Sequence, residues 1–287
     1  MIVITGATGR LGSQIVERLL TRVPAGQVAV SVRDAAKAAG LAARGVRVRE
    51  GNFSDPASLA HAFEGAEQVL VVSSNDAGAE AETQHKAAID AARAAGAEHV
   101  VYTSHQASAA DSEFLPMRDH AATERYLAAQ GGKFTSLRNG FYASTVPRLI
   151  GQALETGTII APADGPVSWT AHADLAEAAA IVLAGENPFD GVAPPLTAPD
   201  VLDLKSVAEL LSELTGRTIT RVVADDDEWR AEQVEQGRSE FQAEFTLGMF
   251  RAARRGEFAA TGPALGALIG HPAAPLRSLL EEVVAGR

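Results

Sequence analysis

The stretch ITGATGRLGSQIV, residues 4–16, decides how the rest of the sequence is interpreted. The apolar and β-branched residues from Ile2 to Thr5 predict a short buried strand at its start. Three glycines follow at intervals of three, Gly6, Gly9 and Gly12, and an amphipathic helix pattern begins with them. A strand, a glycine-rich turn and a helix in this order are typical of the first unit of a parallel α/β sheet.

The glycines would allow a phosphate group to reach the amino end of the helix. A helix N-terminus has free backbone N–H groups and partial positive charge, so it binds a diphosphate that can come close. Gly6 would turn the chain out of the strand, Gly9 would let the backbone meet the phosphate, and Gly12 would let the helix lie against the strand. A bare glycine pattern is weak evidence, but its place between strand and helix predicts a dinucleotide-binding loop rather than an ordinary tight turn.

The residue after the second strand predicts which dinucleotide binds. In the run VAVSVRDAAKA, residues 28–38, Arg33 stands where an acidic residue would bind the ribose 2′-hydroxyl of NAD. Lys37 lies one helical turn further and can contact the same oxygens. The two cations favour NADP(H). The alternative is a solvated Arg33 paired with a surface carboxylate, for which Asp34 is the neighbour.

Short apolar runs alternate with helix-period stretches up to about residue 138, and prolines become frequent after residue 140. The expected strands are Ile2 to Thr5, Gln27 to Val32, Val46 to Arg49, Gln68 to Val72, His99 to Thr103 and Phe134 to Leu137. We predict an α/β fold, a Rossmann-like doubly wound parallel sheet with a smaller, mainly helical C-terminal substrate domain. The NADP(H)-binding Rossmann domain is expected to comprise 1–140 plus about 171–200, and the substrate domain about 141–170 plus 201–287.

Further helices are expected from residue patterns elsewhere in the chain, one of them an amphipathic helix over 204–214 that ends before Gly216. The run 79–95 is rich in alanine and ends before Gly96, which is a usual helix stop. The acidic run 225–228 is expected to open a helix rather than bind a cation. The apolar stripe of 276–284 predicts a terminal helix that is core or a subunit contact, which leaves homo-oligomerisation open.

Composition limits the partners and the chemistry. The net charge of −11 gives no electrostatic footprint for nucleic acid or an anionic membrane, so we expect a small-molecule partner, no direct nucleic-acid binding and no membrane association. The absence of cysteine excludes disulfides, thiolate catalysis and sulfur-ligated metals, and no metal centre is expected. No basic leader precedes the first strand and no run reaches the roughly 18 apolar residues of a membrane span, so a cytoplasmic protein is expected.

Four motifs relate the chain to a known family: TGATGRLG, SVRD, VVYTS and LRNGFY. With them the sequence resembles the NmrA-like atypical short-chain dehydrogenase/reductases, in particular the branch of NAD(P)H quinone oxidoreductase type 2 and triphenylmethane reductase. The resemblance covers nearly the whole chain, including LIGHP at 268–272, and is strongest in the first 145 residues. It implies NADP(H) across the C-terminal edge of the sheet. The positions that match the family's cofactor contacts are Gly6, Thr8, Gly9, Arg10, Leu11, Arg33, Ser73, Ser74, Thr103, Asn139, Gly140, Phe141 and Tyr142.

Most members of the wider superfamily use a Tyr-x-x-x-Lys pair, in which the lysine lowers the pKa of the phenol so that it can donate a proton. None of the three tyrosines, Tyr102, Tyr126 and Tyr142, is followed four residues later by lysine. In the corresponding helix the sequence RDHAATERYL has His120 and Glu124 at this spacing, which favours an exposed helix pair.

The missing pair constrains the reaction. Reducing a simple ketone creates a strongly basic alkoxide, whereas hydride delivery to a quinone or a dye cation spreads or cancels charge. We therefore expect an NADPH-dependent oxidoreductase acting on a quinone or similar conjugated acceptor. The catalytic candidates at the C-terminal edge of the sheet are Ser104, His105 and Tyr142, and His172 is a candidate substrate-binding residue beside Asp174, which is expected in the first turn or at the cap of a helix.

Two alternatives stay open. NmrA-like proteins include redox sensors that bind the dinucleotide without turning it over, and loss of the Tyr/Lys pair is compatible with such a non-catalytic NADP(H)-binding regulator. A nucleotide-sugar epimerase or dehydratase of the extended superfamily branch is argued against by the same loss. The fold alone does not choose among these functions.

Overall fold

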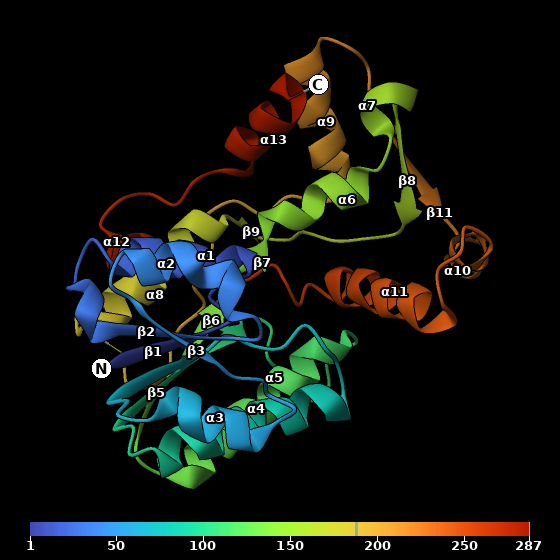
Figure 1. Ribbon diagram of the computed structural model, residues 1–287. Helices are drawn as coiled ribbons and strands as arrows, with labels where there is room; N and C mark the ends of the chain where they lie inside the picture. The colour runs from blue at the N-terminus through green and yellow to red at the C-terminus, as the bar shows by residue number, and fades with distance from the viewer. Residues whose placement is uncertain (187–188, 287) are drawn as a thin grey trace.

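The fold is built on a seven-stranded parallel sheet with the strand order β10-β6-β5-β4-β1-β2-β3 (Figure 1). The structure, a computed structural model, describes residues 1–186 and 189–286. Its sheet strands are β1 (Ile2–Thr5), β2 (Val28–Val32), β3 (Arg47–Glu50), β4 (Gln68–Val71), β5 (His99–His105), β6 (Lys133–Asn139) and β10 (Gly191–Val192). The chain starts at β1 in the middle, runs outward through β2 and β3, and returns to β4 on the other side of β1. The predicted doubly wound α/β fold is confirmed.

Helices cover both faces of the sheet, as the doubly wound topology requires. Helices α1 (Arg10–Leu19), α8 (His172–Leu183) and α12 (Ala264–Ile269) lie on one face, and α3 (Pro56–Phe63), α4 (Ala79–Ala94) and α5 (Leu115–Gln130) lie on the other (Figure 1). Helix α1 buries Leu11, Ile15, Val16 and Leu19 on one face, as expected for an amphipathic helix. The short helical segment η1 (Ala25–Gln27) leads from α1 into β2, and η2 (Ala35–Ala38) and α2 (Ala39–Ala43) connect β2 to β3.

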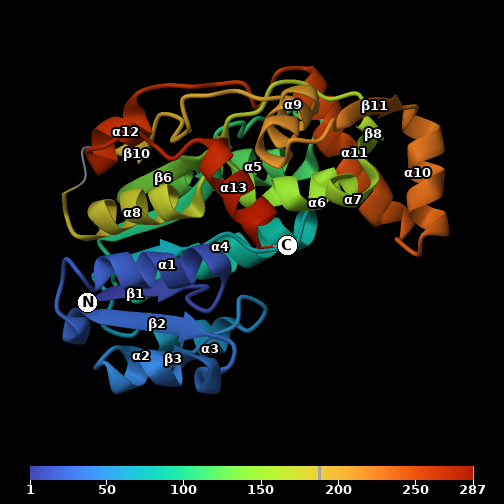
Figure 2. The same ribbon diagram turned by 90° about the horizontal axis from the view of Figure 1, so that it is seen from above.

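The second core lies beyond the C-terminal edge of the sheet. Its elements are β7 (Phe141–Tyr142), η3 (Ala143–Thr145), α6 (Val146–Ile150), α7 (Ala153–Thr156), β8 (Thr158–Pro162), β9 (Trp169–Thr170), α9 (Leu204–Thr215), β11 (Thr220–Ala224), α10 (Asp226–Glu235), α11 (Glu240–Arg254) and α13 (Leu276–Ala285). Strand β8 pairs with β11 and β7 with β9, both in parallel. Figures 1 and 2 both show α7, β8, β11 and α10 at the end of the molecule away from β2 and β3.

Several local expectations in this region can be compared with the structure. Asp225 caps α10 by accepting hydrogen bonds from the backbone N–H groups of Asp227 and Glu228, as predicted for the acidic run. Helix α13 buries Leu276 and Leu280 in the second core. Helix α12 lies in 201–287, the range expected for the substrate domain, but its buried residues share the core of α1 and α8. None of the helices in the described part of the chain has the length and apolarity that a bilayer crossing requires.

The close approach of α1 to the preceding loop predicts that Gly12→Ala destabilises the fold. A Cβ at Gly12 would lie 2.7 Å from the carbonyl carbon of Gly6, which is backbone and cannot move aside cheaply. Overpacking of this kind costs about 1–3 kcal/mol. We expect a lower thermal unfolding midpoint, measured by circular dichroism. Gly40→Ala in α2 is the control, because a Cβ there meets nothing within 4 Å. Equal midpoints for both variants would contradict the prediction.

Candidate active site

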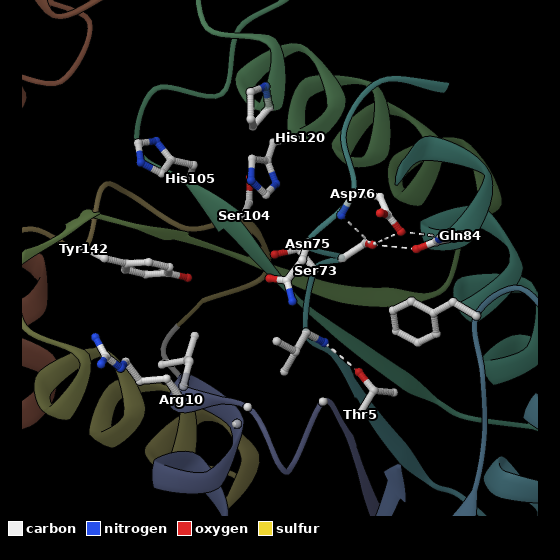
Figure 3. Close-up of a pocket in the computed structure, with 18 of the residues that line it drawn as sticks. Thr5, Arg10, Ser73, Asn75, Asp76, Gln84, Ser104, His105, His120 and Tyr142 are labelled. Carbon is white, nitrogen blue, oxygen red and sulfur yellow. Dashed lines mark hydrogen bonds between the residues drawn. The ribbon is translucent and has the colours of Figure 1, made fainter. Parts of the chain in front are cut away.

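A cavity of about 1010 Å³ opens at the carboxyl ends of the central strands (Figure 3). Its walls come from the loop after β1, the ends of β2 to β5, and residues of α5, α6 and α11. It lies at the point where the strand order reverses between β1 and β4, which is where open α/β sheets bind their ligands. Its volume is at the upper end of the roughly 300–1,000 Å³ of small-molecule sites. The cavity is therefore large enough for more than one small ligand.

The glycine loop forms one wall of this cavity. Gly6 has a φ of 61°, which favours glycine, and its carbonyl oxygen accepts a hydrogen bond from the Gly9 N–H at 2.9 Å. Gly9 is the N-cap of α1 and supplies no side chain, and the first turn of α1 has no acidic residue. The N–H groups and the positive end of the helix dipole are thus left for an anion.

Cations flank this anion site. Arg10 and Arg33 line the cavity and are exposed, and no carboxylate in the described part of the chain forms an ion pair with either. Asp34, the neighbour that could have neutralised Arg33, instead accepts a hydrogen bond from the Ala36 N–H at 3.0 Å and lies 3.9 Å from Lys37 Nζ. The Arg33 guanidinium at the end of β2 is therefore not neutralised by Asp34.

Most of the predicted site residues line the cavity. They are Gly6, Thr8, Gly9, Arg10, Leu11, Arg33, Lys37, Ser73, Ser74, Ser104, His105, Phe141, Tyr142 and His172. Thr103, Asn139 and Gly140 lie behind the wall. Thr103 Oγ1 accepts a hydrogen bond from the Ser73 N–H at 2.8 Å, and the Asn139 carbonyl accepts one from the Gln106 N–H at 2.8 Å. These residues support the cavity wall from behind.

Gly140 is needed for close packing. A Cβ at this position would lie 2.8 Å from the Cβ of Thr170, so only glycine lets β6 and β7 pass the strand β9.

The ring of Tyr142, two residues after Gly140, packs on the ring of His172 with centroids 4.3 Å apart. Burial raises the pKa of Tyr142, and burial with the nearby Arg10 charge lowers the pKa of His172 to about 4. Both side chains are therefore neutral at pH 7.

The pair His120 and Glu124 is not the exposed helix pair that its spacing favours. Glu124 is 6% exposed and accepts hydrogen bonds from Ser104 Oγ at 2.7 Å and from Arg138 Nη2 at 2.6 Å. Burial alone would raise the pKa of Glu124, but the bonds from Arg138 and Ser104 outweigh it, so the pKa is lowered. The hydroxyl hydrogen of Ser104 thus points to a buried carboxylate, and Ser104 offers the cavity a lone pair rather than a proton.

The side of the cavity that α5 and α11 line, called the acceptor side below, is apolar and aromatic. Phe114 packs on Phe245 with ring centroids 5.0 Å apart, and on Phe141 at 6.2 Å with an interplanar angle of 24°. Met117 of α5 and Met249 of α11 also line the cavity. No local pattern in the sequence identified Phe245 or Met249 as a site residue, because α11 reaches the cavity only through tertiary packing. Such walls fit a flat, conjugated ring.

A parallel doubly wound sheet with a free helix N-terminus, free cations and an adjoining aromatic slot defines a dinucleotide-binding α/β protein with a second ligand site. The NmrA-like family matches residues 1–247 of the chain. Quinone oxidoreductase 2 of Escherichia coli (strain K12) is 36% identical over 278 residues, which cover 96% of this chain and 96% of that protein. The chain therefore belongs to the NmrA-like family, as predicted.

Two solved structures are similar throughout. The E. coli NADPH-dependent quinone oxidoreductase complexed with NADPH superposes with a TM-score of 0.92 at 33% identity, covering 99% of this chain and 100% of that chain. The Citrobacter sp. triphenylmethane reductase complexed with NADP(H) superposes with a TM-score of 0.89 at 32% identity, covering 98% and 99% of the two chains. Both similarities extend over the glycine loop, the sheet and the second core.

The buried imidazoles predict that stability falls as the pH drops from 6.5 to 5. Burial lowers the pKa of His85 to about 3 and of His120 to about 4, whereas an unfolded histidine titrates near 6.5. Between these values the unfolded chain binds protons that the native chain does not, so each histidine lowers the unfolding free energy by up to about 1.4 kcal/mol per pH unit.

Urea unfolding at pH 7.5, 6 and 5 measures this effect. We expect the midpoint to fall steadily below pH 6.5, before most carboxylates titrate. His61→Ala, which removes an exposed histidine, should leave the slope unchanged. A midpoint that is the same at pH 7.5 and pH 5 would contradict the assignment of neutral buried imidazoles.

Proposed function

We propose that the chain is an NADPH-dependent oxidoreductase that passes a hydride from NADPH to a quinone or a similar conjugated acceptor, without a Tyr-x-x-x-Lys relay. The observation that carries the proposal is the cavity itself, in which a phosphate-binding helix end and an aromatic slot share one space. The NADPH and NADP(H) complexes of the two similar structures support the cofactor, and their names support the acceptor class.

The residues of the cavity fit the proposed cofactor. The N-terminus of α1 would hold the diphosphate, because no side chain caps its N–H groups and Gly9 places no side chain in front of them. Arg33, with Lys37 beside it, would bind the 2′-phosphate. The bound dinucleotide supplies the hydride. The division into a cofactor domain and a substrate domain is part of the same proposal.

Neither Tyr142 nor His105, the titratable candidates on the acceptor side, is an acid of suitable pKa. Tyr142 and His105 are neutral, because burial raises the pKa of the Tyr142 phenol and lowers that of the His105 imidazole well below its usual value. Both groups can donate hydrogen bonds to an acceptor oxygen without losing a proton. The hydroxyl of Ser104 faces Glu124 and would accept a hydrogen bond rather than polarise the acceptor. His172 would form the wall behind Tyr142.

Mixing purified protein with NADPH and a benzoquinone tests the function. We expect NADPH absorbance at 340 nm to fall well above the uncatalysed rate, with saturation in both substrates. Tight NADPH binding with no consumption across a panel of quinones and triphenylmethane dyes would contradict the enzyme and support the NADP(H)-binding regulator instead.

Arg33→Ala tests the cofactor assignment. A charge-assisted hydrogen bond contributes about 1.5–3 kcal/mol, so we expect the Kd for NADPH to rise by about 10-fold to 100-fold while the Kd for NADH changes less than about twofold. Titration calorimetry with both cofactors measures this. Arg47→Ala is the matched control, because Arg47 is an exposed arginine on β3 that does not line the cavity. An equal loss for NADPH and NADH would remove the 2′-phosphate contact from the proposal.

A further inference from the structure

A cluster of aromatic and imidazole rings lies against the acceptor side of the cavity, and the proposed function uses only one of them. Tyr102 and His105 come from β5, His85 from α4 and His120 from α5. The ring of His120 lies 5.7 Å from Tyr102, 6.4 Å from His85 and 6.3 Å from His105, measured between centroids. Figure 3 shows His120 and His105 on the same side of the cavity as Ser104.

The hydrogen bonds of His85 fix its tautomer. The backbone N–H of Ser74 donates to His85 Nε2 at 2.9 Å, so this nitrogen carries no proton. In the neutral ring the proton is on Nδ1, which lies 2.9 Å from Thr123 Oγ1. The Thr123 hydroxyl gives its own hydrogen to the Asp119 carbonyl at 2.8 Å and is free to accept. His85 Nδ1 is therefore a donor.

The tautomer of His85 determines that of His120. Tyr102 Oη lies 3.3 Å from His85 Nδ1, which is a donor, and 2.7 Å from His120 Nδ1. The phenol hydrogen is therefore directed to His120 Nδ1, and the proton of the neutral His120 ring is on Nε2. Burial lowers the pKa of His120 to about 4 although Glu124 raises it, so the ring is neutral. His120 lines the cavity, and because Tyr102 takes Nδ1, Nε2–H is the polar group of the ring that remains free of Tyr102.

His105 presents a second N–H of the same kind. Its Nδ1 accepts a hydrogen bond from the Ala107 N–H at 3.1 Å, which places the proton on Nε2. The rings of Phe141 and Phe258 pack edge-on at 5.3 and 5.7 Å from its centroid and hold it in place. The His105 and His120 rings are within 20° of parallel. Two neutral imidazole N–H groups thus line the same part of the cavity.

We propose that His120 Nε2–H, with its tautomer fixed by Tyr102, and His105 Nε2–H donate hydrogen bonds to the acceptor oxygen on which negative charge develops. The inference rests on the proposed function. When a quinone takes up a hydride, two electrons and one hydrogen pass to it, and NADPH would be oxidised to NADP⁺. One quinone oxygen ends as a hydroxyl that carries this hydrogen, and the other becomes a phenolate. Both imidazoles keep their protons, and the phenolate takes its proton from water. His120 is thereby a catalytic residue and Tyr102 a positioning residue.

Variants of His120 and Tyr102 test the donor. His120→Leu should lower kcat about 10-fold with the Kd for NADPH unchanged, less than the loss of an oxyanion donor in acyl transfer because a phenolate spreads its charge. His120→Gln, whose amide nitrogen can replace Nε2–H, should recover much of this loss. Tyr102→Phe should lower kcat by a smaller factor. Tyr126→Phe is the matched control, because the Tyr126 hydroxyl donates to Asp90 on the surface.

Nitrogen-15 NMR of the histidine rings reports the tautomers directly. In the unaltered protein the His120 signal should show Nε2–H with an unprotonated Nδ1, and in Tyr102→Phe it should shift towards a mixture. A protonated Nδ1 in the unaltered protein would overturn the proposal without any variant. So would an unchanged kcat in folded His120→Leu, or a loss confined to the Kd for NADPH. If the unaltered protein does not consume NADPH with quinones, the proposed function fails, and the catalytic role of His120 fails with it even where the NMR shows Nε2–H.

Discussion

The contact between the first turn of α1 and the carbonyl of Gly6 is the constraint on which the rest of the structure depends. It requires glycine at the point of contact, because any side chain would enter the backbone of the loop. In return, the amino end of α1 stays open at the edge of the sheet, with N–H groups that no side chain caps. The packing of α1 on α8 and of α8 on α12 then anchors this helix from the far side. The cavity forms where it does because this helix end cannot be covered by the protein itself.

A layer of buried polar groups supports the opposite wall. Thr5 Oγ1 accepts a hydrogen bond from the Val72 N–H at 2.8 Å, and Thr103 Oγ1 accepts one from the Ser73 N–H at 2.8 Å. Because buried polar groups must be paired, each of these bonds fixes the end of a strand in one position. The carboxylate of Glu124 likewise binds side chains from both β5 and β6. The strand ends that face the cavity are thus joined to one another by buried hydrogen bonds.

The sequence predicted those features that depend on neighbours along the chain. The strands, the glycine loop, α1 and the exposed Arg33 follow from short patterns, and the structure has them at the expected places. The expectation that His120 and Glu124 form an exposed helix pair is wrong, because helix spacing does not say which side of a helix faces the protein. Their partners, Tyr102 and Arg138, lie on β5 and β6, and no local pattern of α5 shows that its polar side is the buried one.

The same limit applies to the aromatic slot and to α12. Phe245 and Met249 belong to an amphipathic helix, and the sequence alone does not show that one turn of it faces the cofactor cavity. Helix α12 follows α11 in the chain but packs on α8, and its Leu265 and Ile269 are buried in the core of the sheet helices. Both placements are tertiary, and they decide the shape of the acceptor side.

The protonation states of the site argue for the proposed class of acceptor. The rings of His105, His120 and Tyr142 are neutral, and a neutral imidazole or phenol in a buried site stabilises charge by hydrogen bonding without releasing a proton. Such a site suits a product anion whose conjugate acid is about as acidic as a tyrosine phenol, with a pKa of about 10. Water can protonate such an anion afterwards. The site does not suit an alkoxide, whose basicity is close to that of hydroxide, since the pKa of water is about 15.7. An acceptor that becomes a phenolate therefore matches these side chains, and a simple ketone would need the acid that the Tyr-x-x-x-Lys pair supplies elsewhere in the superfamily.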